Sequence, residues 1–155
     1  MVQHRLPMLP SAGEVPWIAS VNGTEKKLNI ENNAILLDVL RDQAGSLGTK
    51  RGCDMGTCGC CSVLIDGEPR LSCLTLAVEA DGCKITTVEG LADGHHLHPI
   101  QEMFAECGGS QCGFCTPGFW LLLLLYWKIT LVLTMRKLNL QSKEICADVL
   151  VINKL

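Results

Sequence analysis

Apolar and polar residues alternate near the start of the chain, and their spacing predicts strands. Residues 17–32, WIASVNGTEKKLNIEN, alternate on both sides of the pair Asn22-Gly23. An Asn-Gly pair between two alternating segments is a strong signal for a β-hairpin with a two-residue turn. The pattern changes in residues 34–45, AILLDVLRDQAG, where apolar residues cluster at 35, 36, 37, 39 and 40 before Gly45. We expect an amphipathic helix there that ends at the glycine.

The later part of the chain repeats the strand signals and then becomes helical. Residues 62–78, SVLIDGEPRLSCLTLAV, contain Asp66-Gly67, which predicts a second hairpin, and residues 83–90 suit a last strand. Pro99 then precedes Ile100, Met103 and Phe104, whose spacing fits one face of a helix. We therefore predict an α+β chain, with a β-grasp-like domain over residues 17–88 after a flexible N-terminus (1–16), and a small helical domain over residues 89–155.

Charge and composition narrow the function classes. The formal net charge is −3, and the acidic and basic residues are scattered, so nothing argues for a nucleic-acid partner. Residues 1–16 contain prolines and polar residues without an apolar core segment, which disfavours a secretory leader and favours a cytoplasmic protein. In that reducing setting, the 10 cysteines indicate metal binding or redox chemistry in preference to disulfides.

The cysteines of residues 52–73 have the spacing of an iron–sulfur site. Cys53, Cys58 and Cys61 form a C-x4-C-x2-C run, and Cys73 follows on the predicted hairpin. This spacing with a distant fourth cysteine is the plant-type [2Fe–2S] pattern, in which four thiolates bind two irons. Glycines at 52, 56 and 59 would let the loop turn tightly and bring backbone N–H groups close to the sulfurs.

Two alternatives to this ligand set remain open. Zinc also binds four cysteines, although its ligands usually come as two short C-x2–4-C pairs. Cys60 lies between two candidate ligands, and a register that uses it would give a C-x1-C chelate of poor geometry. We expect Cys60 to point away from the cluster as a free thiol.

Several segments closely resemble the small iron–sulfur subunit of the molybdenum hydroxylases. The resemblance is carried by GTKRGCDMGTCGCCSVLIDGEPRLSC, ITTVEGLA, LHPIQ and QCGFCTPGF, and it covers about residues 17–119. That group includes xanthine dehydrogenases, aldehyde oxidoreductases, carbon monoxide dehydrogenase and 4-hydroxybenzoyl-CoA reductase. The resemblance implies a plant-ferredoxin-like domain with one [2Fe–2S] cluster, followed by a helical domain with a second.

The resemblance also implies the role of individual residues. The first cluster would be bound by Cys53, Cys58, Cys61 and Cys73. Cys112 and Cys115 would supply half the ligands of the second, and Gln111 would lie near the molybdopterin cofactor of a large subunit. The chain would carry no substrate chemistry itself; it would pass electrons from the molybdenum site to FAD on a medium subunit or to another acceptor. A stand-alone module, either a single-cluster ferredoxin or a zinc domain, is the alternative.

The C-terminal segment lacks the expected CRCTGY motif, which supplies the other two ligands of the second cluster in that family. If residues from about 125 onward are read one base out of frame, the segment ICADVLVI, residues 145–152, becomes Asn-Leu-Cys-Arg-Cys-Thr-Gly-Tyr with permitted codons. The two cysteine codons would straddle Ala147 and Val149. We therefore expect residues 120–155 to be out of frame, from a sequencing error or a mutation, and the second cluster site to be incomplete.

Two further features of the sequence permit other interpretations. Residues 119–135 are mostly apolar, close to the length of a membrane span, but Lys128 near the middle disfavours a membrane anchor. Lys50 and Arg51 beside the cysteine loop are candidates for steering a redox partner, although two surface charges usually have no such role.

Overall fold

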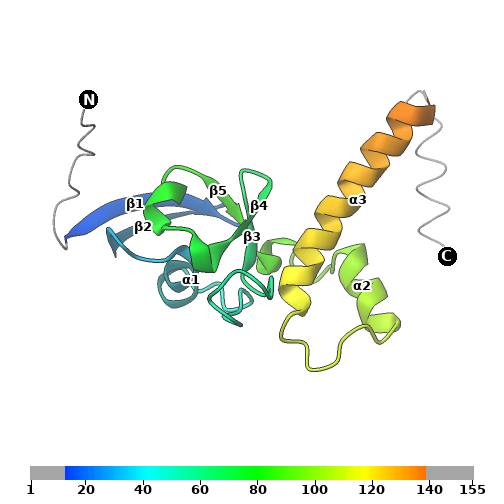
Figure 1. The fold of residues 1–155 in the computed structure, drawn as a ribbon, viewed down its shortest axis with the longest axis horizontal. Coiled ribbons are helices and arrows are strands. Elements are labelled where there is room, and N and C mark those ends of the chain that lie inside the picture. Colours follow the sequence, from blue (N-terminus) through cyan, green and yellow to red (C-terminus); the bar gives the residue numbers. More distant parts are fainter. Residues whose placement is uncertain (1–12, 139–155) are drawn as a thin grey trace, which may run out of the picture. The chain divides into compact units, whose positions relative to one another are not determined.

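The computed structural model describes residues 13–138, with side chains as far as residue 130, and Figure 1 gives the order of its elements. Five strands, β1 (Glu14–Val21), β2 (Thr24–Glu31), β3 (Ser62–Ile65), β4 (Glu68–Leu71) and β5 (Lys84–Thr86), form one sheet. The helical segments are α1 (Leu36–Asp38), a π-helical stretch (Val39–Gln43), three short 3₁₀ segments (Ser72–Leu74, Ala77–Ala80 and Val88–Gly90), α2 (Pro99–Glu106) and α3 (Thr116–Leu138). The described residues fall into two units, which divide between Leu122 and Leu123.

The sheet has the order β2-β1-β5-β3-β4. β1 is antiparallel to β2 and parallel to β5, while β3 is antiparallel to both β4 and β5. A mixed sheet of five strands with a helical segment between β2 and β3 is the predicted α+β architecture. The fold class is therefore confirmed.

Both predicted hairpins are present, with the turn residues that the sequence indicated. Asn22 and Gly23 have φ angles of 51° and 80°, and Asp66 and Gly67 have 50° and 85°. Two consecutive positive φ angles define the type I′ turn that matches the twist of paired strands. β1 begins at Glu14 rather than Trp17, since Val15 pairs in register with Ile30.

The predicted helices also form, but the apolar spacing did not predict the type of helix over residues 36–43. Residues 36–43 make one short α-helical turn that continues as a π-helix, and Gly45 follows with a φ angle of 82°. α2 begins at Pro99, where a capping box joins His98 and Gln101: the His98 ring accepts the N–H of Ile100, and the Gln101 side chain accepts the N–H of His98. In residues 13–138 no helix, α3 included, combines the length and apolar character needed to cross a membrane.

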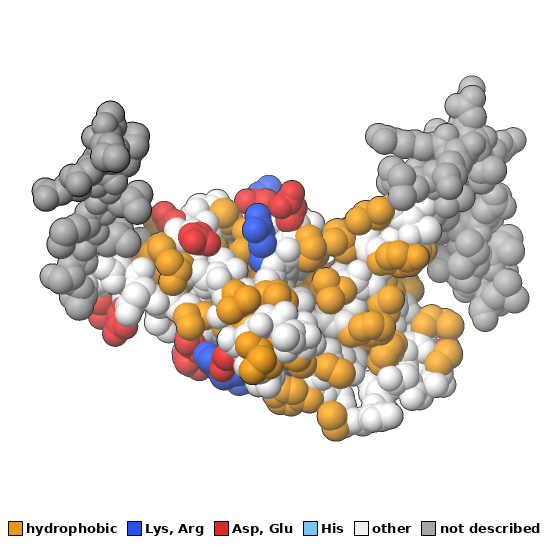
Figure 2. Space-filling model, in the orientation of Figure 1, with side chains coloured by type: hydrophobic (Ala, Val, Ile, Leu, Met, Phe, Trp, Pro, Cys, Tyr) orange, Lys and Arg blue, Asp and Glu red, His pale blue; other side chains and the backbone are white. Residues whose placement is uncertain are grey.

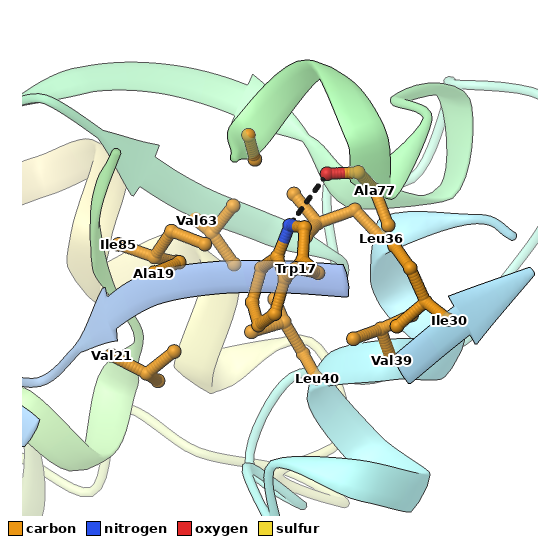
Figure 3. Packing of buried hydrophobic residues seen from close by; sticks show 11 residues of the cluster. Trp17, Ala19, Val21, Ile30, Leu36, Val39, Leu40, Val63, Ala77 and Ile85 are labelled. Atoms are coloured by element: carbon orange, nitrogen blue, oxygen red, sulfur yellow. Dashed lines mark hydrogen bonds between the residues drawn. The ribbon is translucent and has the colours of Figure 1, made fainter. Parts of the chain in front are cut away.

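A single indole ring fills the centre of the core under the sheet (Figure 3). Trp17 is 1% exposed, and its Nε1–H donates to the carbonyl of Ala77 at 2.8 Å. Trp17 and Ala77 belong to one cluster of buried side chains from the sheet, the helical segment and the 3₁₀ segment Ala77–Ala80, with Ala19, Val21, Ile30, Leu36, Val39, Leu40, Val63, Ala80 and Ile85. Because Ala77 lies 60 residues further along the chain, this bond ties β1 to the segment that precedes β5.

Charged side chains of both signs lie beside one another on the face shown in Figure 2. Ion pairs such as Lys27–Glu25 at 2.9 Å and Arg70–Glu68 at 3.6 Å are exposed to water. Exposed pairs of this kind contribute little to stability. The free energy of folding for this domain must therefore come mainly from the core around Trp17.

We expect Trp17→Phe to lower the free energy of unfolding by about 2–4 kcal/mol, because the Ala77 carbonyl loses its donor and the smaller ring leaves a cavity. Urea denaturation measures the change. Ile18→Ala, on the opposite face of β1 and 44% exposed, is the control and should change stability by less than about 1 kcal/mol. Equal destabilisation by the two variants would contradict this view of the core.

Candidate metal centre

The four cysteines of the first predicted site come from one loop and the turn after β4. Cys53 and Cys58 belong to the segment between the π-helical stretch and β3, Cys61 immediately precedes β3, and Cys73 lies in the 3₁₀ turn Ser72–Leu74. Cys58 is exposed and Cys53 half-buried, whereas Cys61 and Cys73 are buried. The site is thus open to solvent on one side and packed against the protein on the other.

These thiols act on one another in two sets. Cys58 influences the pKa of both Cys53 and Cys60, and Cys61 influences the pKa of Cys73. The two sets are near enough for Cys53 to act electrostatically on Cys73. Within the described residues, no group of three or more His, Cys, Asp or Glu side chains closes around a single ion.

The backbone around Cys53 stabilises its thiolate form. The Thr57 hydroxyl, then the backbone N–H groups of Met55 and Cys58, lower the pKa of the Cys53 thiol from 9.0 to about 6. Burial has the opposite effect on Cys73, whose pKa is raised to about 11, with a further contribution from its hydrogen bond to Cys61. Cys53 is therefore ready to bind a metal as thiolate, while Cys73 ionises only when a cation replaces its proton.

Glycines provide the space that the sulfurs need. A Cβ atom added to Gly52 would lie 2.7 Å from Sγ of Cys58 and 3.1 Å from Sγ of Cys60. One added to Gly56, whose φ angle is 75°, would lie 2.7 Å from the side chain of Leu74. Since real Cβ atoms essentially never make contacts under 3.0 Å, a side chain at Gly52 would displace Cys58, whereas at Gly56 the positive φ angle is the main obstacle to a side chain.

The buried end of the loop is fixed by backbone and hydroxyl groups. The carbonyl of Cys61 accepts both the N–H of Ser72 at 3.2 Å and its hydroxyl at 2.7 Å. The N–H of Lys50 donates to the carbonyl of Cys60 at 3.2 Å, which closes the loop at its base. These bonds hold Cys61 beside Cys73.

Cys60 lies closer to the predicted ligands than the sequence suggested. Its side chain is 5% exposed, it is hydrogen-bonded to Cys58, and its Sγ lies 3.9 Å from the Cys58 carbonyl. Burial, followed by these neighbours, raises the pKa of Cys60 to about 11. The Cys60 thiol therefore lies on the Cys58 side of the site. Cys61 is preferred over Cys60 as the ligand because it is Cys61 that interacts with Cys73.

The second predicted set lies in the loop between α2 and α3. Gln111, Cys112 and Cys115 are exposed, and Gly113, with a φ angle of 77°, turns the chain between the two cysteines. Cys115 is near enough to Cys60 to act on it electrostatically. The first turn of α3 meets the cysteine loop here, because a Cβ on Gly118 would collide with the Gly59 carbonyl oxygen and lie 3.2 Å from Cys60 backbone atoms. Sequence reasoning gave Gly118 no role, since only the folded chain brings it to Gly59.

Ala147 and Val149, where the missing cysteine codons would fall, lie outside the described residues. The described loop therefore carries two of the predicted ligands of the second site, Cys112 and Cys115. The frame error remains a prediction from the sequence.

Comparison with known proteins gives two overlapping family matches. Residues 15–105 match the family described as 2Fe-2S iron-sulfur cluster binding domain, and residues 87–130 match the [2Fe-2S] binding domain family. The chain is 45% identical over 109 residues to the aldehyde oxidoreductase iron-sulfur-binding subunit PaoA of Escherichia coli K12, a match that covers 70% of this chain and 48% of PaoA. It is 48% identical over 103 residues to the aldehyde oxidoreductase of Megalodesulfovibrio gigas, covering 66% of this chain and 11% of that protein.

A solved structure gives the same result. Quinoline 2-oxidoreductase from Pseudomonas putida 86 matches with a TM-score of 0.66 and 48% sequence identity, over 68% of this chain and 65% of that one. The matches to the two curated relatives cover 48% of PaoA and 11% of the Megalodesulfovibrio gigas protein, so the chain spans about half or less of the length of each. The two family matches and these relatives agree with the cysteine motifs: the chain belongs to the [2Fe–2S] iron–sulfur subunits of the molybdenum hydroxylase family.

Proposed function

We propose that this chain is the electron-transfer subunit of a molybdenum-containing hydroxylase or dehydrogenase, and that Cys53, Cys58, Cys61 and Cys73 bind its [2Fe–2S] cluster. The observation that carries the proposal is that the fold places the C-x4-C-x2-C run in one loop and brings Cys73, in the turn after β4, close enough for Cys61 and Cys53 to act on its pKa. Two thiolates for each of two irons is the ligand requirement of this cluster. When bound, a [2Fe–2S] cluster supplies one-electron redox chemistry.

The protein groups around the site perform distinct tasks. Cys61 and Cys73 are buried beside Leu37, which keeps water away from one side of the site. The N–H groups of Met55 and Cys58 and the Thr57 hydroxyl point at the Cys53 sulfur and favour its negative charge. Hydrogen bonds to ligand sulfurs, together with solvent exposure, set the reduction potential of such a site. The chain thus fixes ligand geometry and potential, and the oxidation of substrate is assigned to a partner.

The partners that we propose are a molybdopterin-binding large subunit and an FAD-binding medium subunit, in the cytoplasm. Support comes from relatives named as subunits, such as the iron-sulfur-binding subunit PaoA and the 6-hydroxypseudooxynicotine dehydrogenase complex subunit beta of Paenarthrobacter nicotinovorans. Gln111 is proposed to lie near the molybdopterin. Its exposure on the loop before α3 would allow contact with another subunit.

For the chain as written we propose one complete cluster. Cys112 and Cys115 offer two thiolates for the second site, and Ala147 and Val149 have no donor atoms to complete it. Two irons need four terminal ligands, so the second cluster would require the restored reading frame. Electron transfer between the molybdenum site and this chain would then be interrupted in the unrepaired protein.

Adjacent cysteines provide a matched test of the first ligand set. We expect Cys60→Ser to keep the visible absorption of the [2Fe–2S] cluster and Cys61→Ser to lose it, because it is Cys61 that interacts with Cys73. The absorption spectrum and iron content of the purified variants measure this. Loss of the spectrum in Cys60→Ser together with its retention in Cys61→Ser would reverse the assignment.

Iron content tests the proposal of a single complete cluster. We expect about two irons per polypeptide for the chain as written and about four after the frame is restored through CRCTGY. Metal analysis of both proteins, with zinc measured in parallel, distinguishes a two-iron site from a zinc domain. Four irons in both proteins would mean that the tail supplies ligands as it stands, and zinc in place of iron would contradict the proposed function.

A further inference from the structure

The segment that carries Cys53 and Cys58 has few connections to the rest of the protein. In the described part of the chain, no backbone–backbone hydrogen bond joins residues 51–58 to another element, although bonds at Lys50 and Gly59 close the loop on either side. Within the loop, the backbone N–H of Gly56 is directed at the Cys73 sulfur, and Gly56 packs on the exposed side chain of Leu74. Holding two metal ligands in a fixed geometry requires some further link.

Arg51 provides that link. Its Nη2 donates to Oδ1 of Asp38 at the end of α1, and its Nη1 donates to Oδ1 of Asp54 at 2.7 Å. Asp54 directly follows the ligand Cys53 and has a φ angle of 53°, the left-handed region that side chains rarely adopt. One guanidinium therefore joins the framework helix to the strained residue beside the first ligand.

The planar guanidinium suits this role because it donates to two carboxylates in fixed directions. An isolated exposed ion pair is weak, and the three side chains here are 39–48% exposed. The hydrogen bonds of Arg51 to Asp38 and Asp54 can matter more than their own free energy suggests, because they limit the motion of a loop that has no other polar connection to α1. Groups that orient metal ligands have effects on the metal site larger than their effects on folding.

We propose that Arg51 is a positioning residue for the metal centre: by bridging Asp38 and Asp54, it holds the ligand loop, residues 51–58, against α1. This inference rests on the proposed function and assigns Arg51 a role within the chain instead of partner steering. Arg51 precedes the ligand Cys53 by two positions in the chain, so we expect its positive charge to favour the reduced cluster.

The effects of position and of charge can be separated with two substitutions. Arg51→Gln and Asp38→Asn both break the link, and we expect both to release the cluster to a chelator about tenfold faster than the wild-type chain. Their charge effects are opposite. Arg51→Gln should lower the ratio of reduced to oxidised cluster at a fixed potential by about threefold, about 30 mV for one electron, while Asp38→Asn should raise it.

Two further variants control the experiment. Arg70→Gln removes an exposed arginine that pairs with Glu68 at 3.6 Å on β4, outside the ligand loop, and should leave both measurements unchanged. Arg51→Lys keeps the charge and one donor direction, so it should preserve the potential and restore cluster retention in part. Bleaching of the visible absorption in chelator gives the release rate, and a spectroscopic redox titration gives the potential.

The inference would be overturned if Arg51→Gln and Asp38→Asn released the cluster no faster than the control Arg70→Gln. A wild-type chain that binds no [2Fe–2S] cluster would contradict the proposed function, and the positioning role is then decided in the metal-free chain. There, ¹⁵N relaxation of residues 52–58 should report greater mobility in Arg51→Gln and Asp38→Asn than in Arg70→Gln. Equal mobility in the three variants would overturn the inference independently of the cluster.

Discussion

Four sulfur atoms must be brought to one place by a stretch of chain that has almost no regular hydrogen bonding. Three of them come from residues 53–61, which form neither strand nor helix. Gly52 leaves room for the sulfurs, because any side chain there would overlap Sγ of Cys58 and crowd Sγ of Cys60. The rest of the chain can be understood as the support that such a loop requires.

That support has a rigid part and a local part. The rigid part is the sheet and the helical segment packed around Trp17, which fix the two ends of the loop at α1 and β3. The local part consists of single polar contacts at the loop itself: Ser72 holds the Cys61 carbonyl, and Arg51 connects the loop to Asp38. The sheet provides most of the folding free energy, and the local contacts determine where the thiols lie.

Much of this could be predicted from the sequence, because the relevant signals are local. The turns at Asn22-Gly23 and Asp66-Gly67 need positive φ angles, which these residue types adopt most readily, and Pro99 marks the start of α2 by its fixed φ. The cysteine spacing gave the candidate ligands directly. The parallel pairing of β1 with β5, the π-helical stretch and the contact of Gly118 with Gly59 could not be predicted, since each depends on residues far apart in the chain or on packing. The environment of Cys60 was missed for the same reason: its side chain is buried by segments that meet only in the fold.

The central claim is that the four thiols hold two metal ions that share a cluster. X-ray absorption at the iron edge of the anaerobically reconstituted chain tests this most directly, because it reports both the atoms bound to each iron and the presence of a second iron nearby. The account predicts an all-sulfur first shell together with a distinct iron–iron contribution, and both should be lost when Cys61 is replaced by serine. A mononuclear metal in a shell of four sulfurs, with no metal–metal contribution, would contradict it.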